Sequence, residues 1–268
     1  SDLSYQCSVT FSGSPDDVRA GLLSGELDIA AVPVNMAAAL YNKTGGEILT
    51  LAANTLGVLY IVEKGDTVQS MADLAGTKIL AAGQGSTPEY VINYLLEKNG
   101  LTDSVQVEYV SEHAEAVTQM AAGGADLILV PEPFVTTALS KVEGARVALD
   151  LTQEWAKVSD ADMVMGCLVV SKTFAQEHPD ALDAFMDNYA ASADYCTSHT
   201  AEAAALIEKF GIMGSAALAE KAIPNCNIVC VTGQEMADMV TGMLTVLFDA
   251  NPKSVGGSLP GEEMFYLG

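Results

Sequence analysis

The stretch SGELDIAAVPVNMAAALYNK, residues 24–43, and the stretch AGGADLILVPEPFVTTALSK, residues 122–141, read as two copies of one unit. The two copies carry the same residue at five aligned positions: Gly25 and Gly123, Asp28 and Asp126, Val32 and Val130, Pro33 and Pro131, Lys43 and Lys141. In each copy a glycine turn precedes a buried strand, and a proline separates that strand from a helix. We interpret this pattern as an internal repeat.

The same offset holds upstream of both copies. The alternating segment Gln6–Phe11, predicted as a strand, falls on Ser104–Tyr109, and the helix predicted at Pro15–Leu23 falls on His113–Ala121. A repeated β-α-β-α block predicts two similar lobes with a ligand cleft between them, because ligands of open α/β sheets bind at the carboxyl ends of strands, where helices begin. The alternative is that any two βαβ units share Gly and Asp at their turns, so that the matching prolines arise by chance.

Composition restricts the class of protein. The chain has 268 residues, of which half are apolar and 6% aromatic, which is typical of an α/β protein with a full core. Its net charge of −23 argues against nucleic-acid binding, because there is no basic stripe to neutralise phosphates. An anionic small ligand remains compatible with that charge, since helix N-termini can hold an anion.

Cysteine and histidine spacing predicts neither a metal site nor a cofactor. The five cysteines form no CxxC pair, and the three histidines neighbour no Cys or acid at metal-ligand spacing. Cys226 and Cys230 are close enough in sequence to pair, but all five cysteines are better interpreted as small apolar core residues. No apolar run reaches membrane-spanning length, and we expect any leader peptide to lie outside this chain.

The order of predicted elements suggests a discontinuous first lobe. If the chain crosses between lobes near Val62–Asp66 and returns near Gly166–Ser171, residues 1–63 and 166–268 form lobe I and residues 64–165 form lobe II. The mainly helical segment after Ser171 then packs on the first lobe. Two crossings make a hinge, which predicts closure of the lobes around a ligand.

The turn Gly85-Ser86-Thr87 is the first candidate binding segment. It follows a strand predicted at Lys78–Ala82 and begins a helix predicted from Pro88 to about Asn99, with Ser86 or Thr87 as its cap. Exposed N–H groups and hydroxyls there suit a carboxylate, sulfonate or phosphate. The alternative is a plain helix cap, and the segment lacks the Gly-Lys-Ser/Thr ending of a P-loop.

The ends of other predicted strands supply the remaining candidates. They are polar or aromatic residues at strand-to-helix turns: Pro33, Asn35, Asn54, Thr55, Glu132, Pro133 and Phe134. Glu132 suits a ligand ammonium or ring nitrogen, or instead a backbone N–H of its own loop. Trp155, the single tryptophan, is either a stacking wall for a ligand or part of lobe packing.

Four segments carry a resemblance to a known family: SGELDIAAVP, SMADLAGTKILAAGQGSTPEYVINYLLEKNGL, AVTQMAAGGADLILVPEPFVTTAL and LVVSKTFAQEHPDALDAFMDNYAASADYC. They make the chain similar to the solute-binding proteins of ABC importers in the nitrate, sulfonate and thiamine-precursor group, which have the two-lobe type II periplasmic binding fold. The resemblance implies mixed sheets flanked by helices and a monomeric extracytoplasmic receptor, periplasmic or a cell-surface lipoprotein. Such a receptor delivers a small polar or anionic solute to a membrane permease, and the turns named above would contact the solute.

Two departures from the family pattern affect these expectations. Members of this family usually have a strand, a loop and a helix before the segment that corresponds to Gln6–Phe11, so we expect the first strand to be missing from this chain. The family also includes a pyrimidine-synthase branch whose Cys-rich iron motif is absent here. We therefore expect a receptor rather than an enzyme.

Two other classes of function are alternatives to the receptor. The first is an enzyme on the same two-lobe scaffold, pyrimidine-synthase-like or similar to menaquinone-pathway proteins, in which Glu132 is the candidate acid or base. The second is the effector domain of a regulator, which no helix-turn-helix or basic segment supports.

Overall fold

The computed structural model describes residues 6–12 and 14–268, and the chain divides into two compact units. The first unit contains the residues up to Thr55, Gly166–Tyr195 and Val229–Gly268, and the second contains Leu56–Met165 and Cys196–Ile228. The chain therefore passes between the units four times rather than twice. The second unit begins at Leu56 instead of residue 64, and it includes residues 196–228, which the sequence analysis placed in the first lobe.

The sheet of the first unit has the strand order β1-β8-β2-β9. These strands are β1 (Ile29–Pro33), β8 (Gly166–Ser171), β2 (Ile48–Thr55) and β9 (Ile228–Val231). Because β8 is antiparallel to both β1 and β2, those two strands run in the same direction. Their last residues, Pro33 and Thr55, both lie opposite Gly166 at the start of β8. Both strands therefore end at one edge of the sheet.

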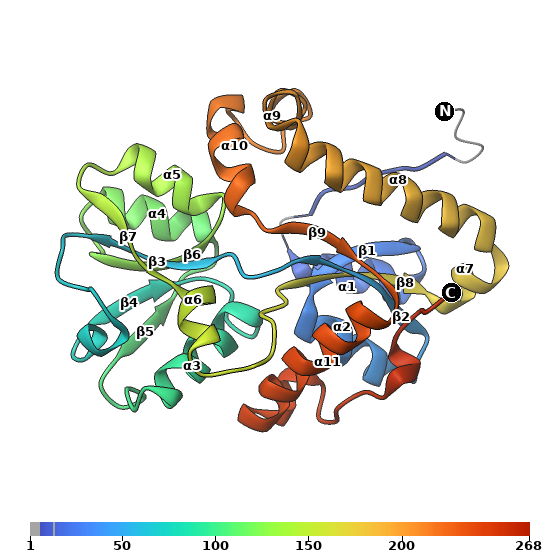
Figure 1. Cartoon of the computed structure of the whole chain (residues 1–268), viewed down its shortest axis with the longest axis horizontal. Helices are drawn as coiled ribbons and strands as arrows, with labels where there is room; N and C mark the ends of the chain where they lie inside the picture. Colours follow the sequence, from blue (N-terminus) through green and yellow to red (C-terminus); the bar gives the residue numbers. More distant parts are fainter. Residues whose placement is uncertain (1–5, 13) are drawn as a thin grey trace. The chain divides into compact units, whose positions relative to one another are not determined.

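Helices cover both faces of this first sheet (Figure 1). They are α1 (Pro15–Ser24), α2 (Val34–Thr44), α7 (Lys172–Glu177), α8 (Pro179–Ser198) and α11 (Gly233–Ala250), with the short 3₁₀ helices η3 (Pro252–Val255) and η4 (Glu262–Met264) near the C-terminus. Helices α2 and α11 lie on one face, and α7 and α8 lie on the other. On the α7 and α8 side, Leu182 packs against Leu51, Leu168 and Val170.

The sheet of the second unit is mixed, with the order β5-β4-β6-β3-β7. The strands are β5 (Gln106–Tyr109), β4 (Lys78–Ala81), β6 (Leu127–Pro131), β3 (Leu59–Lys64) and β7 (Ala145–Asp150). Strand β4 is parallel to β5 and β6, and β3 is antiparallel to β6 and β7. Strands β5, β4, β6 and β7 therefore end at the same side of the sheet, which we call the carboxyl edge.

Two layers of helices enclose the second sheet (Figure 1). The helices of this unit are α3 (Thr87–Lys98), α4 (His113–Ala121), α5 (Phe134–Lys141), α6 (Leu151–Ala156), α9 (Thr200–Lys209) and α10 (Ala216–Ala222), with the 3₁₀ helices η1 (Met71–Leu74) and η2 (Ile223–Asn225). Helices α4 and α5 pack on Leu80, Ile128 and Val130, whereas α3 and α6 cover the opposite face.

Trp155 belongs to the packing of the second unit. Its ring lies 4.8 Å from the ring of Tyr94 between centroids, and the residue is only 2% exposed. Its indole N–H donates to the carbonyl of Ala161 at 2.6 Å. Of the two interpretations of this residue, the structure supports packing, because a ring buried this deeply inside its own unit offers no face to a ligand.

The internal repeat is present as a helix–strand–helix unit, α1-β1-α2 in the first unit and α4-β6-α5 in the second. Gly25 and Gly123 adopt the same left-handed backbone conformation, with φ of 77° and 79°. This conformation ends each first helix sharply and favours glycine. The matched glycines therefore end the first helix of the unit in both copies.

The prediction of a strand at Gln6–Phe11 is wrong. Residues 6–12 form no strand and are exposed, with Val9 and Phe11 each 68% exposed. In the second copy the equivalent segment is β5, which pairs with β4. An alternating pattern forms a strand only where a neighbouring strand supplies hydrogen bonds, and none does so at residues 6–12.

The sequence analysis did not single out the short elements α6, α7 and β9. Strand β9 has only four residues, all half-buried, so it provides too little pattern to separate a strand from a turn. Helix α6 is identified by its cap, because the Asp150 carboxylate accepts from the N–H groups of Thr152 at 2.9 Å and Gln153 at 3.3 Å.

Within the described residues, every helix is too short or too polar to cross a bilayer.

Candidate functional site

The predicted binding residues of the first unit meet at one sheet edge. Pro33 ends β1 and Asn35 lies in the first turn of α2. Asn54 and Thr55 end β2, and the register places Pro33 and Thr55 on either side of Gly166. The structure thus brings together residues that are about twenty positions apart in the sequence. This is where ligands of α/β sheets bind.

Internal hydrogen bonds hold this group in place. Asn35 is 6% exposed, and its amide donates to the carbonyl of Ser254 at 3.3 Å. Asn54 is 8% exposed, and its Oδ1 accepts from the Thr55 hydroxyl at 3.2 Å. A Cβ on Gly166 would lie 2.6 Å from that same Oδ1. The absence of a side chain at position 166 therefore makes the room for Asn54.

The predicted residues of the second unit lie at its carboxyl edge. Segment 85–87 joins β4 to α3, and segment 132–134 joins β6 to α5. Because β4 and β6 are neighbouring parallel strands, the two turns leave the sheet side by side.

The turn before α3 differs from the prediction in its capping. Ser86 occupies the N-cap position but makes no side-chain cap bond, and Thr87 is 1% exposed. The Glu89 carboxylate instead folds back and accepts from the N–H of Gly85 at 2.5 Å. Gly85 has a left-handed φ of 74°, which a side chain would disfavour. An acid of the first helical turn therefore supplies the negative charge at this helix N-terminus.

Glu132 is bound to the first turn of the helix that follows it, α5. Its carboxylate accepts from the Thr136 N–H at 3.0 Å and from the Thr136 hydroxyl at 2.9 Å, while its backbone N–H donates to Val58 at 3.1 Å. The sequence analysis offered a ligand group or a backbone N–H of the same loop as the partner of Glu132; in the structure the partner is a backbone N–H of α5, one turn further along the chain. Burial raises the pKa of Glu132, although the bonds from Thr136 act in the opposite direction. Each carboxylate oxygen retains a lone pair for a further donor.

Aromatic residues that the sequence analysis did not select also reach this edge. Tyr109 ends β5, His113 begins α4, and the His113 ring lies 5.4 Å from that of Phe134 between centroids. Among the described residues, Tyr109 Oη and His113 Nδ1 are buried without a hydrogen-bond partner. Buried polar groups usually have hydrogen-bond partners, so two buried polar atoms without such a partner at one sheet edge are unusual. The sequence signal that could have identified Tyr109 is an aromatic residue at the end of a strand.

Burial shifts the pKa values of these groups. It lowers the pKa of His113 to about 4, so the ring is neutral at pH 7, and it raises the pKa of Tyr109. Burial, followed by the negative charges of Asp150 and Glu132, raises the pKa of Tyr60 to about 12. The edge therefore presents neutral aromatic groups beside carboxylates.

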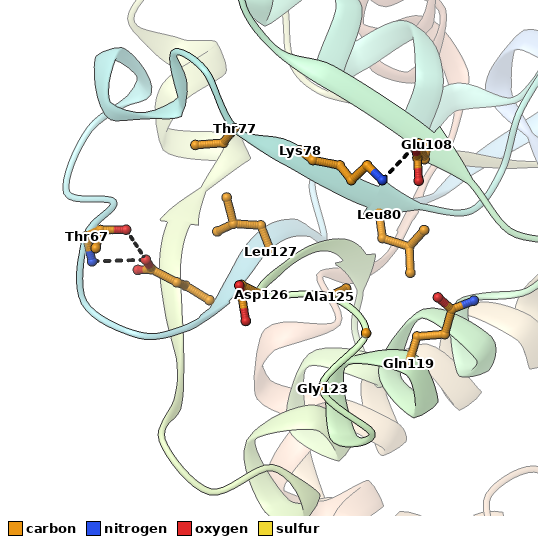
Figure 2. A pocket seen from close by; sticks show the side chains of 12 residues that line it. Thr67, Thr77, Lys78, Leu80, Glu108, Gln119, Gly123, Ala125, Asp126 and Leu127 are labelled. Carbon is orange, nitrogen blue, oxygen red and sulfur yellow. Dashed lines mark hydrogen bonds and ion pairs between the residues drawn. The ribbon is translucent and has the colours of Figure 1, made fainter.

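A pocket of about 380 Å³ lies at the opposite edge of the same sheet, where β4 and β6 begin (Figure 2). Three of its charged side chains form ion pairs: Lys78 Nζ lies 2.7 Å from Glu108 Oε1, and Glu63 Oε2 lies 2.6 Å from Arg146, which is outside the lining. None of the predicted binding residues lines this pocket. We therefore do not assign the solute to it.

The fold and the polar strand ends define a class, the two-lobe α/β binding proteins. The chain matches the NMT1-like family over residues 5–209. It therefore belongs to the NMT1-like family. No curated protein matches the chain.

Solved structures of similar fold include several binding proteins. An ABC transporter structure from Parabacteroides distasonis is 28% identical with a TM-score of 0.81, over 97% of this chain and 88% of that one. The periplasmic aliphatic sulphonate binding protein SsuA from Escherichia coli is 15% identical with a TM-score of 0.75, over 94% and 80%. A mutant of DszB in complex with biphenyl-2-sulfinic acid is 13% identical with a TM-score of 0.62, over 89% and 83%.

These comparisons confirm the predicted fold class and the family resemblance. The similar structures are mostly binding proteins of transporters, which supports a binding receptor. No group of three or more His, Cys, Asp or Glu side chains suited to a metal occurs in the part of the chain that the structure describes.

Proposed function

We propose that this protein is an extracytoplasmic solute-binding receptor of an ABC importer. It captures a small polar or anionic solute by lobe closure and delivers it to a membrane permease. The solute classes considered are sulfonates, nitrate-like anions and thiamine or pyrimidine precursors. The observation that carries the proposal is membership of the NMT1-like family together with polar residues at the carboxyl ends of strands in each unit.

The proposed solute contacts are the residues at those strand ends. They are Pro33, Asn35, Asn54 and Thr55 in the first unit, and Gly85, Ser86, Thr87, Glu132, Pro133 and Phe134 in the second. Thr87 and Asn35 are the most buried of the polar members, at 1% and 6% exposed. We propose that these two act mainly by holding the backbone around them, while Glu132 and Phe134, which are half-buried, meet the solute directly.

We propose a receptor without catalysis. Glu132 was the candidate acid or base for an enzyme on this scaffold, and its carboxylate accepts two hydrogen bonds from Thr136. That arrangement is typical of a helix-capping carboxylate. We further propose that the protein acts as a monomer in the periplasm or as a cell-surface lipoprotein.

A thermal-shift screen tests the proposal. The panel contains sulfonates, carboxylates, nitrate, amino acids, pyrimidines and thiamine, each supplied at a large excess. A solute that binds only the folded state at a hundredfold excess over its Kd adds about 2.7 kcal/mol to the stability and raises Tm. Each solute that raises Tm is then incubated with the protein and followed by mass spectrometry. Recovery of unchanged solute supports the receptor, and its conversion to product supports the enzyme instead.

A further inference from the structure

Each helix that begins at the carboxyl edge of the second unit has a carboxylate of the chain itself bound to a backbone N–H in its first turn or just before it. There are four such pairs: Glu89 with Gly85 N at 2.5 Å, Glu115 with Ser111 N at 3.2 Å, Glu132 with Thr136 N at 3.0 Å, and Asp150 with Thr152 N at 2.9 Å. In α3 and α4 the carboxylate lies in the first turn and its donor precedes the helix, whereas for α5 and α6 the carboxylate precedes the helix and its donor is helical. The four helices follow the parallel strands β4, β5, β6 and β7.

This capping opposes an anionic solute at the carboxyl edge. A helix N-terminus attracts an anion through its unbonded N–H groups and its positive dipole end. Here an internal carboxylate lies at the start of each helix, and on α5 and α6 it already binds helical N–H groups, so an incoming anion would meet a like charge. The loops that form the edge, at 56–60, 82–90, 109–113 and 131–137, contain no Lys or Arg. The second unit therefore offers an anion no counter-charge from these loops.

Glu132 is the carboxylate best placed to receive a cation. Its side chain is half-buried, whereas Glu115 is exposed, and within the described residues it forms no ion pair. Keeping a half-buried carboxylate charged costs free energy unless a donor or a cation compensates for the lost water. The two bonds from Thr136 compensate in part, and the remaining lone pairs are available to a solute.

Aromatic groups lie at the same sheet edge as this carboxylate. Phe134 follows it by two residues and stacks near His113, and Tyr60 lies within electrostatic reach of it. Aromatic faces attract cations, and together with a carboxylate they suit ammonium groups and N–H-bearing rings. The unpartnered Tyr109 Oη and His113 Nδ1 belong to the same edge of the described structure.

We propose that the part of the solute that meets the second unit is cationic or carries N–H donors, as a protonated amine, an amidine or an amino-substituted nitrogen heterocycle does, and that Glu132 accepts its hydrogen bond. This inference rests on the proposed receptor function and narrows its solute. A sulfonate or nitrate-like group without an N–H donor is not the group that this unit recognises.

Calorimetric titration with matched probes tests the inference. One pair is 4-amino-2-methylpyrimidine and 2,4-dimethylpyrimidine, and the other is 2-aminoethanesulfonate and ethanesulfonate; within each pair only the first carries the amine. We expect the amine-bearing probe of a binding pair to bind about tenfold more tightly or better, because hydrogen bonds to charged groups are stronger than those between neutral groups.

The variant Glu132→Gln is isosteric and still accepts from Thr136, so it removes the charge while keeping the cap. Glu132→Gln should weaken the binding of the amine-bearing probe by about tenfold. It should leave the Tm measured without solute near the wild-type value. Glu115→Gln is the matched control, since it makes the same chemical change at an exposed cap of the same edge. It should leave binding unchanged.

Two results overturn the inference while leaving the receptor intact: equal binding of the two members of a pair, or equal effects of the two Gln variants. If all four probes fail to bind, the inference is judged on the solute that the wider thermal-shift panel identifies. A solute without N–H donors overturns the inference. The absence of any binder overturns the proposed receptor function, and the inference falls with it.

Discussion

His113 should make the protein lose stability as the pH falls from 7 to 5. Its Nδ1 atom is buried without a partner in the described structure, and burial lowers the pKa of the ring from 6.5 to about 4. The unfolded chain therefore takes up the proton before the folded protein does. Because the folded-state pKa is lowered, this contribution to stability is present above pH 6.5 and disappears as the pH falls toward 4.

The magnitude follows from the two pKa values. Each unit of pKa difference is worth about 1.4 kcal/mol, so a fall from 6.5 to about 4 corresponds at most to roughly 3.4 kcal/mol. The unfolded chain takes up nearly one proton at pH 5, whereas the folded ring stays mostly neutral. Between pH 7 and pH 5 the loss attributable to His113 is therefore about 2 kcal/mol.

Urea unfolding at pH 7, 6 and 5 measures this loss. The wild type is compared with His113→Phe, which keeps a ring beside Phe134 but cannot titrate. Other groups titrate in both proteins, so the difference between the two pH profiles isolates position 113. We expect the wild type to lose about 2 kcal/mol more than the variant. Parallel pH profiles would refute the argument that burial keeps this ring neutral.

Two further predictions concern packing and charge. Gly166→Ala should cost about 1–3 kcal/mol in urea unfolding, because the new Cβ would lie 2.6 Å from Asn54 Oδ1; an unchanged unfolding midpoint would show that Asn54 moves freely. Arg146→Ala should cost about 3 kcal/mol, since it leaves the carboxylate of Glu63, 3% exposed, without its cation. Lys78→Ala, which breaks an exposed pair, is the control and should cost less than about 1 kcal/mol. Equal losses in the last two variants would contradict the argument from burial.

Most elements followed from local sequence signals. The segment after Ser171 is mainly helical, as predicted, and includes α8, and α3 begins one residue before the predicted Pro88. Glycine and proline mark such boundaries because their backbone restrictions act within a few residues. The segment 6–12 is the counterexample. Its alternating pattern is equally local, but a strand also requires a pairing partner from elsewhere in the chain.

The candidate site was predictable in its position and not in its electrostatics. Strand ends such as Thr55 and Glu132 were identified because parallel strands of one sheet end at a common edge. The orientation of the Glu89 and Glu132 carboxylates was not predictable, since it depends on side-chain rotamers around the N–H groups of each turn. Tyr109 and His113 were missed because burial of a polar atom without a partner is a property of the packed structure.

The sequence by itself determined the α/β class, the two-copy repeat and the family resemblance, because periodicity, turn residues and motifs act over short distances along the chain. Only the tertiary structure decided that residues 196–228 join the second unit and that a carboxylate binds a backbone N–H at the start of each of the four helices at its carboxyl edge. The physical reason is that strand pairing, helix docking and side-chain capping bring together groups whose separation along the chain carries no local signal.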